Sequence, residues 1–355
     1  MGNCCLPNKK KRLKTPLLQT EYSNEEKETK KKRSNEIRIV LLGAGESGKS
    51  TFIKQMKFIA NGDFDSQDKL NTKALIRKTC FNQMKVLISN SERLGINLEN
   101  KELANEIKKK NDIDDWDSNF GRELKTLWDD IGIKKTYQFR NKKFHLNDSA
   151  SYFFNSLERI SEDDYDPITE DVLRCRVTTV GLYEETYEFD KYEITFIDVG
   201  GQRSERKKWN HCFERANSMI FFASLTGYCQ VLLENSGINR MKESLNLFSQ
   251  VCKSPWFVSS SIILFLNKQD LFKDLIEEID LHEYFQEYNG GKDYDNAVEF
   301  ITSKYLEVGK SSQFNKNREI FPYVTCALDT KMIKYITKVA IDTLFNNTLK
   351  TIGLI

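Results

Sequence analysis

A segment near residue 40 constrains the fold of this chain more than any other part of its sequence. Residues 37–42, Ile-Arg-Ile-Val-Leu-Leu, form a short apolar and β-branched run typical of a buried strand. The run ends in Gly-Ala-Gly-Glu-Ser-Gly-Lys-Ser at 43–50, and residues 51–59 carry apolar side chains at helical spacing. This order of strand, loop and helix matches G-x-x-x-x-G-K-[ST] and predicts a loop that binds phosphate.

The chemistry of this loop follows from its glycines and from the helix behind it. Glycine lets backbone N–H groups point inward at phosphate oxygens, and the helix adds the positive end of its dipole. Lys49 is expected to reach the β- and γ-phosphates, and the Ser50 hydroxyl to hold Mg²⁺. A glycine turn with only a structural role is the alternative, and the flanking strand and helix argue against it. The residues expected around the phosphates are Gly43, Ala44, Gly45, Glu46, Ser47, Gly48, Lys49, Ser50 and Thr51.

A second motif, Asp-Val-Gly-Gly-Gln at 198–202, follows the apolar run of residues 194–197. Asp198 then lies at the carboxyl end of a strand, where its carboxylate can hold Mg²⁺ through water. The N–H of Gly201 can donate to a γ-phosphate. A D-x-x-G sequence alone is as often a simple turn, but its position after a phosphate-binding loop favours a nucleotide site. The residues expected from this motif are Asp198, Val199, Gly200, Gly201 and Gln202.

A third motif, Asn-Lys-Gln-Asp at 267–270, follows the most apolar run of the chain. The carboxylate of Asp270 can accept from both N1–H and the 2-amino group of guanine, whereas adenine offers no such pair of donors. Asp270 therefore selects GTP over ATP, because adenine would leave a buried carboxylate unpaired. Lys268 is expected to lie against the ring, Asn267 to brace the loops, and segment 325–327 to present an N–H to the guanine oxygen. The residues expected around guanine are Asn267, Lys268, Gln269, Asp270, Cys326 and Ala327.

The hydrophobic pattern divides the rest of the chain into an α/β body and a helical insertion. Residues 63–174 carry apolar stripes at helical spacing, one of them over 150–160, and no convincing alternating strand, which predicts an all-helical bundle. Strand-like runs then return at 194–197, 219–222 and 262–266, and helical patterns occur at 240–252, 297–307 and 330–349. Strands that alternate with helices predict an α/β fold, with a mostly parallel sheet and helices on both faces.

Composition and charge exclude several other classes of protein. Lys and Arg number 54 against 52 Asp and Glu, a net charge of +2, so a nucleic-acid-binding surface over the whole chain is not expected. There is no run of about 18 apolar residues and no apolar secretory signal, which predicts a cytosolic body. The 8 cysteines and 3 histidines lack metal-ligand spacing, so we expect reduced thiols and neither a catalytic histidine nor a metal cluster.

The segment Arg-Cys-Arg-Val-Thr-Thr at 174–179 lies where the helical insertion returns to the α/β body. Here the chain resembles the alpha subunits of heterotrimeric G proteins, over about nine tenths of its length. The matching segments are GAGESGKST (43–51), LNDSA (146–150), DVLRCR (171–176), DVGGQRSERKKW (198–209), NRMKES (239–244), IILFLNKQD (262–270) and TCALDT (325–330).

The resemblance implies a P-loop GTPase domain with an inserted all-α domain, which hydrolyses GTP to GDP and phosphate. The implied parts are a basic N-terminal segment (1–35), the first part of the GTPase domain (36–62), the helical domain (63–174) and the second part of the GTPase domain (175–355).

The resemblance also implies catalytic roles. In that family, itself the standard example of an arginine finger supplied in cis, the arginine three residues before the magnesium-binding threonine neutralises charge on the transferring phosphoryl group. Arg176 would have this role, and Gln202 would orient the attacking water. Thr179 would hold Mg²⁺ together with Ser50, and Asp198 would do so through water. The other residues implied at the nucleotide are Glu46, which would pair with Arg176, and Asp148, Ser149, Leu173, Arg174, Cys175, Val177 and Thr178.

Partners follow from the same resemblance. Segment 203–213 resembles the family's second switch, which binds the beta-gamma dimer in the GDP state and an effector in the GTP state. As a charge run alone, this segment could equally be a solvated helix face. The tail 350–355 resembles the end that contacts a seven-helix receptor. The resemblance therefore implies a signalling switch between a receptor and an effector.

The N-terminus looks like an acylated membrane anchor. Residues 1–33 carry ten basic side chains against four acidic ones, and Gly2, Cys4 and Cys5 are candidates for myristoylation and palmitoylation. Leu6 stands where the N-myristoylation pattern has Ser or Thr, which gives palmitoylation of the cysteines more weight. We expect a lipid-anchored protein at the cytoplasmic face of the plasma membrane. A basic tail with incidental cysteines is the alternative.

Two other functions stay open on the sequence. A P-loop kinase or ATPase would share the phosphate loop, but Asp270 argues against it. A nucleotide-dependent binding module of the same fold would bind GTP with little hydrolysis, and Arg176 and Gln202 argue against that.

Overall fold

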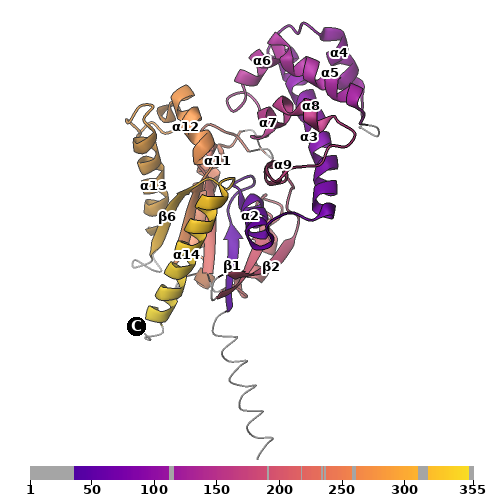
Figure 1. Cartoon of the computed structure of the whole chain (residues 1–355). Helices are drawn as coiled ribbons and strands as arrows, with labels where there is room; N and C mark the ends of the chain where they lie inside the picture. The colour runs from indigo at the N-terminus through magenta and orange to yellow at the C-terminus, as the bar shows by residue number, and fades with distance from the viewer. Residues whose placement is uncertain are drawn as a thin grey trace, which may run out of the picture.

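The computed structural model describes residues 36–111, 116–189, 192–216, 218–232, 235, 237–257, 261–310 and 319–351. They form an α/β body and a block of helices, which lies above the body in Figure 1. The basic N-terminal segment with Gly2, Cys4 and Cys5, and residues 352–355 of the tail, lie outside the described residues. In the part of the chain that is described, no helix is both long enough and apolar enough to cross a lipid bilayer.

A sheet of six described strands forms the centre of the body, in the order β2-β3-β1-β4-β5-β6. Its neighbouring strands run parallel, apart from the antiparallel pair of β2 and β3. The strands are β1 (Glu36–Leu42), β2 (Leu182–Phe189), β3 (Tyr192–Val199), β4 (Ser218–Ser224), β5 (Ile262–Asn267) and β6 (Ile320–Thr325). The predicted mostly parallel sheet is therefore confirmed, and each apolar run predicted as a strand lies in one.

The apolar runs do not predict β2, and its sequence shows why. Leu-Tyr-Glu-Glu-Thr-Tyr-Glu-Phe contains three glutamates, and its Leu182 and Tyr183 are exposed while Tyr187 is buried. β2 lies at the edge of the sheet and pairs with β3 alone among the described strands. An edge strand depends on its backbone ladder more than on burial of both faces, so its hydrophobic signal is weak.

Helices cover both faces of the sheet, and alternate residues of one strand pack against different helices. Ile39 of β1 belongs to the apolar cluster that contains Phe52 of α2 and Ile333 of α14. Its neighbour Val40 belongs to the cluster that contains Phe248 of α11 and Tyr305 of α13. The helices of the body are α2 (Lys49–Asn61), α10 (Asn210–Phe213), α11 (Arg240–Cys252), α12 (Gln269–Glu278), α13 (Tyr294–Lys310) and α14 (Thr330–Thr351), with short 3-10 turns η1 (Arg206–Lys208), η2 (Leu225–Tyr228), η3 (Pro255–Phe257) and η4 (Leu281–Glu283).

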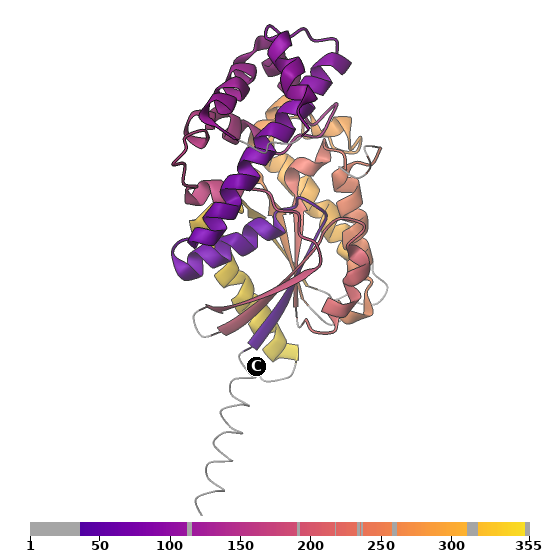
Figure 2. The ribbon, with the colours of Figure 1, turned by 90° about the vertical axis from the view of Figure 1, so that its right-hand side faces the viewer.

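The helical block has an apolar core of its own, and the long helix α3 rises into it from the body (Figure 2). Its helices are α3 (Ser66–Arg93), α4 (Lys101–Lys109), α5 (Ser118–Asp129), α6 (Ile131–Gln138), α7 (Ala150–Asn155), α8 (Leu157–Ile160) and α9 (Thr169–Arg174). Aspartates cap several of them: Asp65 accepts from the N–H of Asp68 at 2.8 Å, and Asp117 from that of Phe120 at 2.7 Å. One predicted stripe, residues 150–160, is two short helices with a break at Ser156.

Candidate nucleotide-binding site

A cavity lies where the carboxyl ends of the parallel strands meet the helical block, and residues from both parts line it. The lining residues that the sequence predicted are Gly45, Glu46, Ser47, Gly48, Lys49, Ser50, Thr51, Asp148, Ser149, Leu173, Arg174, Cys175, Arg176, Val177, Thr178, Thr179, Gly201, Gln202, Asn267, Lys268, Asp270, Cys326 and Ala327. Lys54, Asn147, Leu271 and Leu328 also line the cavity and were not predicted.

A few predicted residues are not part of the cavity wall; they are Gly43, Ala44, Asp198, Val199, Gly200 and Gln269. Asp198 lies behind the wall, within hydrogen-bond distance of the Ser50 hydroxyl. Val199 is buried in the apolar core of the body. The side chain of Gln269 turns toward helix α14, where its Nε2 lies 3.2 Å from the sulfur of Met332. Gln269 therefore contacts α14 instead of the cavity.

The phosphate loop has the backbone that its glycines allow. Gly48 has φ of 106°, and a Cβ there would lie 2.0 Å from Nδ2 of Asn267, so a larger residue would be both strained and blocked. The ammonium of Lys49 donates to the carbonyl oxygens of Gly43 at 2.9 Å and Ala44 at 3.1 Å. Burial lowers the pKa of Lys49 to about 8. The hydroxyl of Ser47 is buried and has no hydrogen-bond partner among the described residues. The loop thus offers a buried cation and an unpaired hydroxyl beside the cavity.

Three oxygen-bearing side chains from separate parts of the chain, those of Ser50, Thr179 and Asp198, meet at this loop. The Ser50 hydroxyl lies 2.7 Å from that of Thr179. Both donate to Oδ2 of Asp198, at 3.1 Å and 3.2 Å. Oδ1 of Asp198 is buried without a hydrogen-bond partner in the described part of the chain. Burial raises the pKa of Asp198, although the charge of Lys49 opposes this. Hydroxyl and carboxylate oxygens suit Mg²⁺, and an unpaired carboxylate oxygen fits a cation or its bound water.

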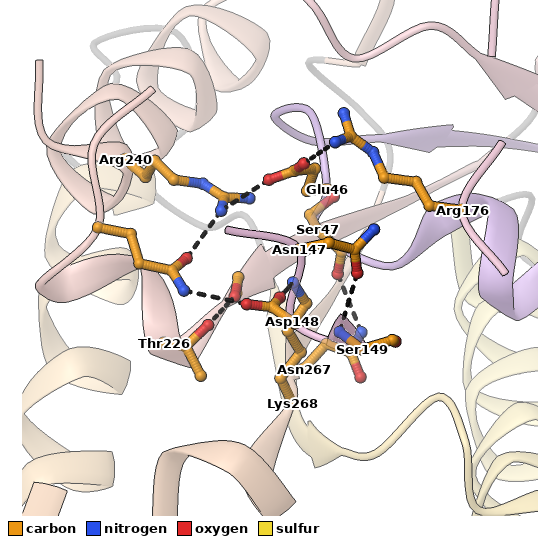
Figure 3. A network of polar contacts seen from close by, with 12 residues as sticks. Glu46, Ser47, Asn147, Asp148, Ser149, Arg176, Thr226, Arg240, Asn267 and Lys268 are labelled. Atoms are coloured by element: carbon orange, nitrogen blue, oxygen red, sulfur yellow. Dashed lines mark hydrogen bonds and ion pairs between the residues drawn. The ribbon is translucent and has the colours of Figure 1, made fainter. Parts of the chain in front are cut away.

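Glu46 lies at the centre of the polar network in Figure 3, between Arg176 and Arg240. It forms an ion pair with Arg176, and its Oε2 lies 2.9 Å from Nη1 of Arg240. Nε2 of His145, from the helical block, lies 3.1 Å from Oε1 of Glu46. Burial favours the neutral acid, but the charge of Arg240 and the contacts with His145 and Arg176 lower the pKa of Glu46 overall. The predicted pairing of Glu46 with Arg176 is therefore present in the structure.

The loop at 267–270 is braced on both sides. Nδ2 of Asn267 donates to the carbonyl oxygen of Ser47 at 2.9 Å, and its Oδ1 accepts from the N–H of Ala327 at 2.9 Å. The ammonium of Lys268 lies 2.5 Å from Oδ2 of Asp148, which belongs to the helical block. Asp270 lines the cavity between these contacts. Asn267 therefore connects the phosphate loop with the loop after β6, as the sequence predicts.

The segment that follows Gly201 is tied to both the cavity and helix α11. The indole N–H of Trp209 donates to the carbonyl oxygen of Gly200 at 3.0 Å, and Trp209 is buried. Arg206 donates to the carbonyl oxygen of Gly201 at 3.3 Å and pairs with Glu243 at 2.7 Å. Segment 203–213 is therefore a solvated face only in part: Lys207 and Lys208 are exposed, whereas Trp209 and Arg206 contact the rest of the body.

Several contacts at the site join residues that no local pattern connects. Lys54 donates to the carbonyl oxygens of Val172 at 2.9 Å and Cys175 at 2.7 Å, which fastens the returning chain to α2. His145 and Arg240 both reach Glu46, His145 at Oε1 and Arg240 at Oε2. Segment 239–244 is one of the segments that carried the resemblance, but the sequence assigned Arg240 no role. Only the tertiary structure brings these side chains to the site.

Comparison with known proteins agrees with this geometry. The sequence model of the family described as G-protein alpha subunit matches residues 17–344. The guanine nucleotide-binding protein alpha-4 subunit of Dictyostelium discoideum is 40% identical over 325 residues, which cover 90% of this chain and 92% of the relative. The guanine nucleotide-binding protein subunit alpha of Emericella nidulans is 38% identical, covering 94% of this chain and 95% of the relative. The alpha-1 subunit of Mycosarcoma maydis is also 38% identical, with 91% and 92% covered.

Proposed function

The chain belongs to the family of G-protein alpha subunits and is a guanine-nucleotide-binding switch and a GTPase; we propose that it holds and hydrolyses GTP in the cavity under the helical block. One observation carries this proposal. The phosphate loop, Arg176 and the loop at 267–270, expected from separate motifs, line the same cavity. A single motif can match by chance. Three motifs that lie far apart in the sequence and meet at one cavity are much harder to explain by chance.

The phosphates are held by the loop at 43–51, where Lys49 supplies the buried positive charge. Ser50 and Thr179, whose hydroxyls lie 2.7 Å apart, would hold Mg²⁺, and the unpaired oxygen of Asp198 would hold it through water. The bound ion would neutralise charge on the β- and γ-phosphates. Asp270 selects guanine by accepting from N1–H and the 2-amino group, with Cys326 and Ala327 at the guanine oxygen.

Hydrolysis uses Arg176 and Gln202. The ion pair with Glu46 holds the guanidinium of Arg176 beside the phosphate loop, from which it neutralises charge that develops on the transferring phosphoryl group. Gln202 lines the same cavity and orients the attacking water. Arg240 occupies the second carboxylate oxygen of Glu46 and keeps that carboxylate in place.

The second switch responds to the γ-phosphate through its backbone contacts. A γ-phosphate that binds the N–H of Gly201 would shift the carbonyl groups to which Trp209 and Arg206 donate. The same segment is the surface for the beta-gamma dimer with GDP and for an effector with GTP. The C-terminal tail contacts a seven-helix receptor.

The domain division of the sequence is kept as part of the proposal: segment 1–35, body parts 36–62 and 175–355, and the helical domain 63–174. The helical block has a core of its own, drawn from residues between Ile76 and Cys175, which supports a division close to these boundaries. The N-terminal segment binds the beta-gamma dimer and the membrane, with lipid on Cys4 or Cys5 and on Gly2, at the cytoplasmic face of the plasma membrane.

A single-turnover measurement of GTP hydrolysis tests the mechanism. Arg176→Ala is expected to slow hydrolysis by about 100-fold or more, because it removes charge placed at the transferring phosphoryl group. GDP binding should remain measurable, since the phosphate loop and Asp270 are unchanged. The matched control is Arg122→Ala, an exposed arginine on α5.

The alternative is a binding module that holds GTP with little hydrolysis. It gains support if the wild-type chain binds GTP but does not hydrolyse it, or if neither Arg176→Ala nor Gln202→Leu changes the rate. Equal affinity for GDP and ADP would instead contradict the guanine site itself.

A further inference from the structure

A histidine of the helical block contacts the carboxylate that pairs with Arg176. Nε2 of His145 lies 3.1 Å from Oε1 of Glu46, and the ion pair with Arg176 uses the same oxygen. The side chains of His145 and Glu46 are 14% and 12% exposed. An ionised carboxylate only accepts hydrogen bonds, so the imidazole carries a hydrogen on Nε2 and donates it. His145 therefore donates to the group that holds the proposed arginine finger.

The backbone on both sides of His145 is anchored in the helical block. Its neighbours Phe144 and Leu146 are buried in the apolar core of the block. One residue further on, the N–H of Asn147 donates to Oε1 of Gln83 on α3 at 2.7 Å. The side chain of His145 lies between two core residues in the sequence but contacts the phosphate loop. The imidazole thus has a fixed support and can in turn fix the residue that it contacts.

The other partners of Glu46 show what is left for His145 to do. Nη1 of Arg240, a residue that is 4% exposed, lies 2.9 Å from Oε2 and holds that oxygen from the body (Figure 3). Oε1 is shared between His145 and Arg176, and the side chain of Arg176 is 29% exposed. Without the imidazole, the position of Oε1 would depend on Arg176, the very side chain that this oxygen holds. A donor from the helical block fixes Oε1 independently of Arg176.

We propose that His145 is a positioning residue for hydrolysis: it holds Oε1 of Glu46 in place, so that Arg176 stays where charge develops on the transferring phosphoryl group. This inference deepens the proposed function and rests on it, since the role of Arg176 belongs to that proposal. The described residues that line the cavity do not include His145, so the imidazole acts through Glu46 and not by touching the nucleotide. A small displacement of a charged group at the reacting atoms is costly, which makes such support effective.

The test is single-turnover hydrolysis of GTP by the full-length protein, which is loaded with GTP and started with Mg²⁺. His145→Leu is expected to hydrolyse GTP about tenfold more slowly, because Oε1 of Glu46 loses a donor and Arg176 is held less well. His145→Gln should stay within about twofold of wild type, because its amide nitrogen reaches about as far as Nε2 and can donate to the same oxygen. This second variant also guards against failure of the leucine variant to fold.

The control variant is His282→Leu. His282 is exposed on η4, and its Nδ1 makes one polar contact, with the carbonyl oxygen of Tyr288 at 2.7 Å. His282 is not among the described residues that line the cavity. Its removal should leave the rate of hydrolysis at the wild-type value, which separates the effect at His145 from the general effect of losing an imidazole.

A double variant separates the positioning of Arg176 from a general structural role. In the Arg176→Ala background, His145→Leu should change the slow residual rate by no more than about twofold, because the group that His145 positions is already absent. A structural role would instead slow hydrolysis by the same factor in both backgrounds.

Three results would overturn the inference: a wild-type rate in His145→Leu, equal slowing in His145→Leu and His145→Gln, or a tenfold effect of His145→Leu that persists in the Arg176→Ala background. None of these results touches the proposed function. That proposal fails on different results, namely a wild-type chain that does not hydrolyse GTP or an Arg176→Ala variant that hydrolyses it at the wild-type rate.

Discussion

Glu46, whose side chain is 12% exposed, holds the proposed catalytic residue Arg176 through an ion pair. Its backbone has φ of 62°, and the phosphate loop presents its carboxylate to side chains from separate parts of the chain. These are Arg176 after α9, Arg240 at the start of α11 and His145 of the helical block. An ionised carboxylate with these partners keeps Arg176 beside the phosphate loop, where the side chain of Arg176 is 29% exposed.

A substitution at Asp270 tests the preference for guanine over adenine at a single residue. Asp270→Asn replaces an acceptor by a donor where guanine presents two donors, so the ratio of affinities for GDP and ADP should fall by about 100-fold or more. Competition of GDP and ADP against a fluorescent guanine nucleotide measures this ratio. Asp274→Asn, an exposed residue on the same helix, should leave it at the wild-type value. An unchanged ratio in Asp270→Asn would assign guanine selection to another group.

Helix α9 positions the segment that carries Arg176 and Thr179, and a buried carboxylate anchors this helix. Asp171 is fully buried and accepts from Arg159 at 2.7 Å and from the hydroxyls of Tyr152 and Tyr165, each at 2.9 Å. Burial opposes ionisation, but the hydrogen bonds from Arg159 and Tyr165 lower the pKa of Asp171 overall. A helix of six residues is too short to be stable by itself, so α9 depends on this network of contacts for its stability.

Asp171→Asn tests this anchor through stability and its dependence on pH. At pH 7 the variant should lose about 2 kcal/mol of unfolding free energy, since the guanidinium of Arg159 loses its buried partner. A carboxyl group whose pKa is lowered in the folded state stabilises the protein at pH values above its ordinary pKa, near 4. This contribution is lost as the pH falls below that value. Urea unfolding should therefore show the difference between variant and wild type shrinking below pH 4.

The control for this experiment is Asp166→Asn, because the side chain of Asp166 is 72% exposed. It should change the unfolding free energy by no more than about 0.5 kcal/mol at any pH. A difference between Asp171→Asn and wild type that stays constant down to pH 3 would show that the Asp171 charge does not stabilise the helix.

At the scale of the whole molecule, the apolar cores of the body and the helical block are separate. The core of the block draws on residues from Ile76 to Cys175, and the two main cores of the body share none of them. A small apolar cluster of Phe64, Val172 and Leu173, with Phe58 and Leu328 packed against it, joins the two parts. Contact between the parts is otherwise largely polar at the cavity, which suits an interface that opens and closes.

This separation predicts that a fragment of residues 63–176 folds alone. Its circular dichroism should be helical, and it should unfold cooperatively on heating, because the buried core is retained in the fragment. A fragment of the body helix α13 and strand β6 is a suitable negative control, since its apolar residues pack against the rest of the sheet. Non-cooperative melting of 63–176, with exposed apolar surface, would mean that the block needs the body to fold.

The sequence by itself determined the fold class and the positions of most strands, and it predicted the chemistry of the three loops. These properties depend on local patterns. A run of apolar residues indicates a buried strand, and apolar residues at helical spacing indicate the buried face of a helix. Glycine permits the left-handed backbone at Gly48. The pattern was weak where burial is weak, so it did not predict edge strand β2. It also could not detect that the apolar stripe at 150–160 is broken at Ser156.

Only the tertiary structure decided which polar groups pair across the cavity. Arg240 and Gly45 are 195 positions apart in the chain, and Gln230 and Asn141 are 89 positions apart, yet they are hydrogen-bonded partners. Neither residue type nor spacing identifies such a pair, because any buried polar group must find a partner and many candidates exist in the sequence. The packing of the helical block against the strand ends selects among them, and this choice determines which contacts join the two parts at the cavity.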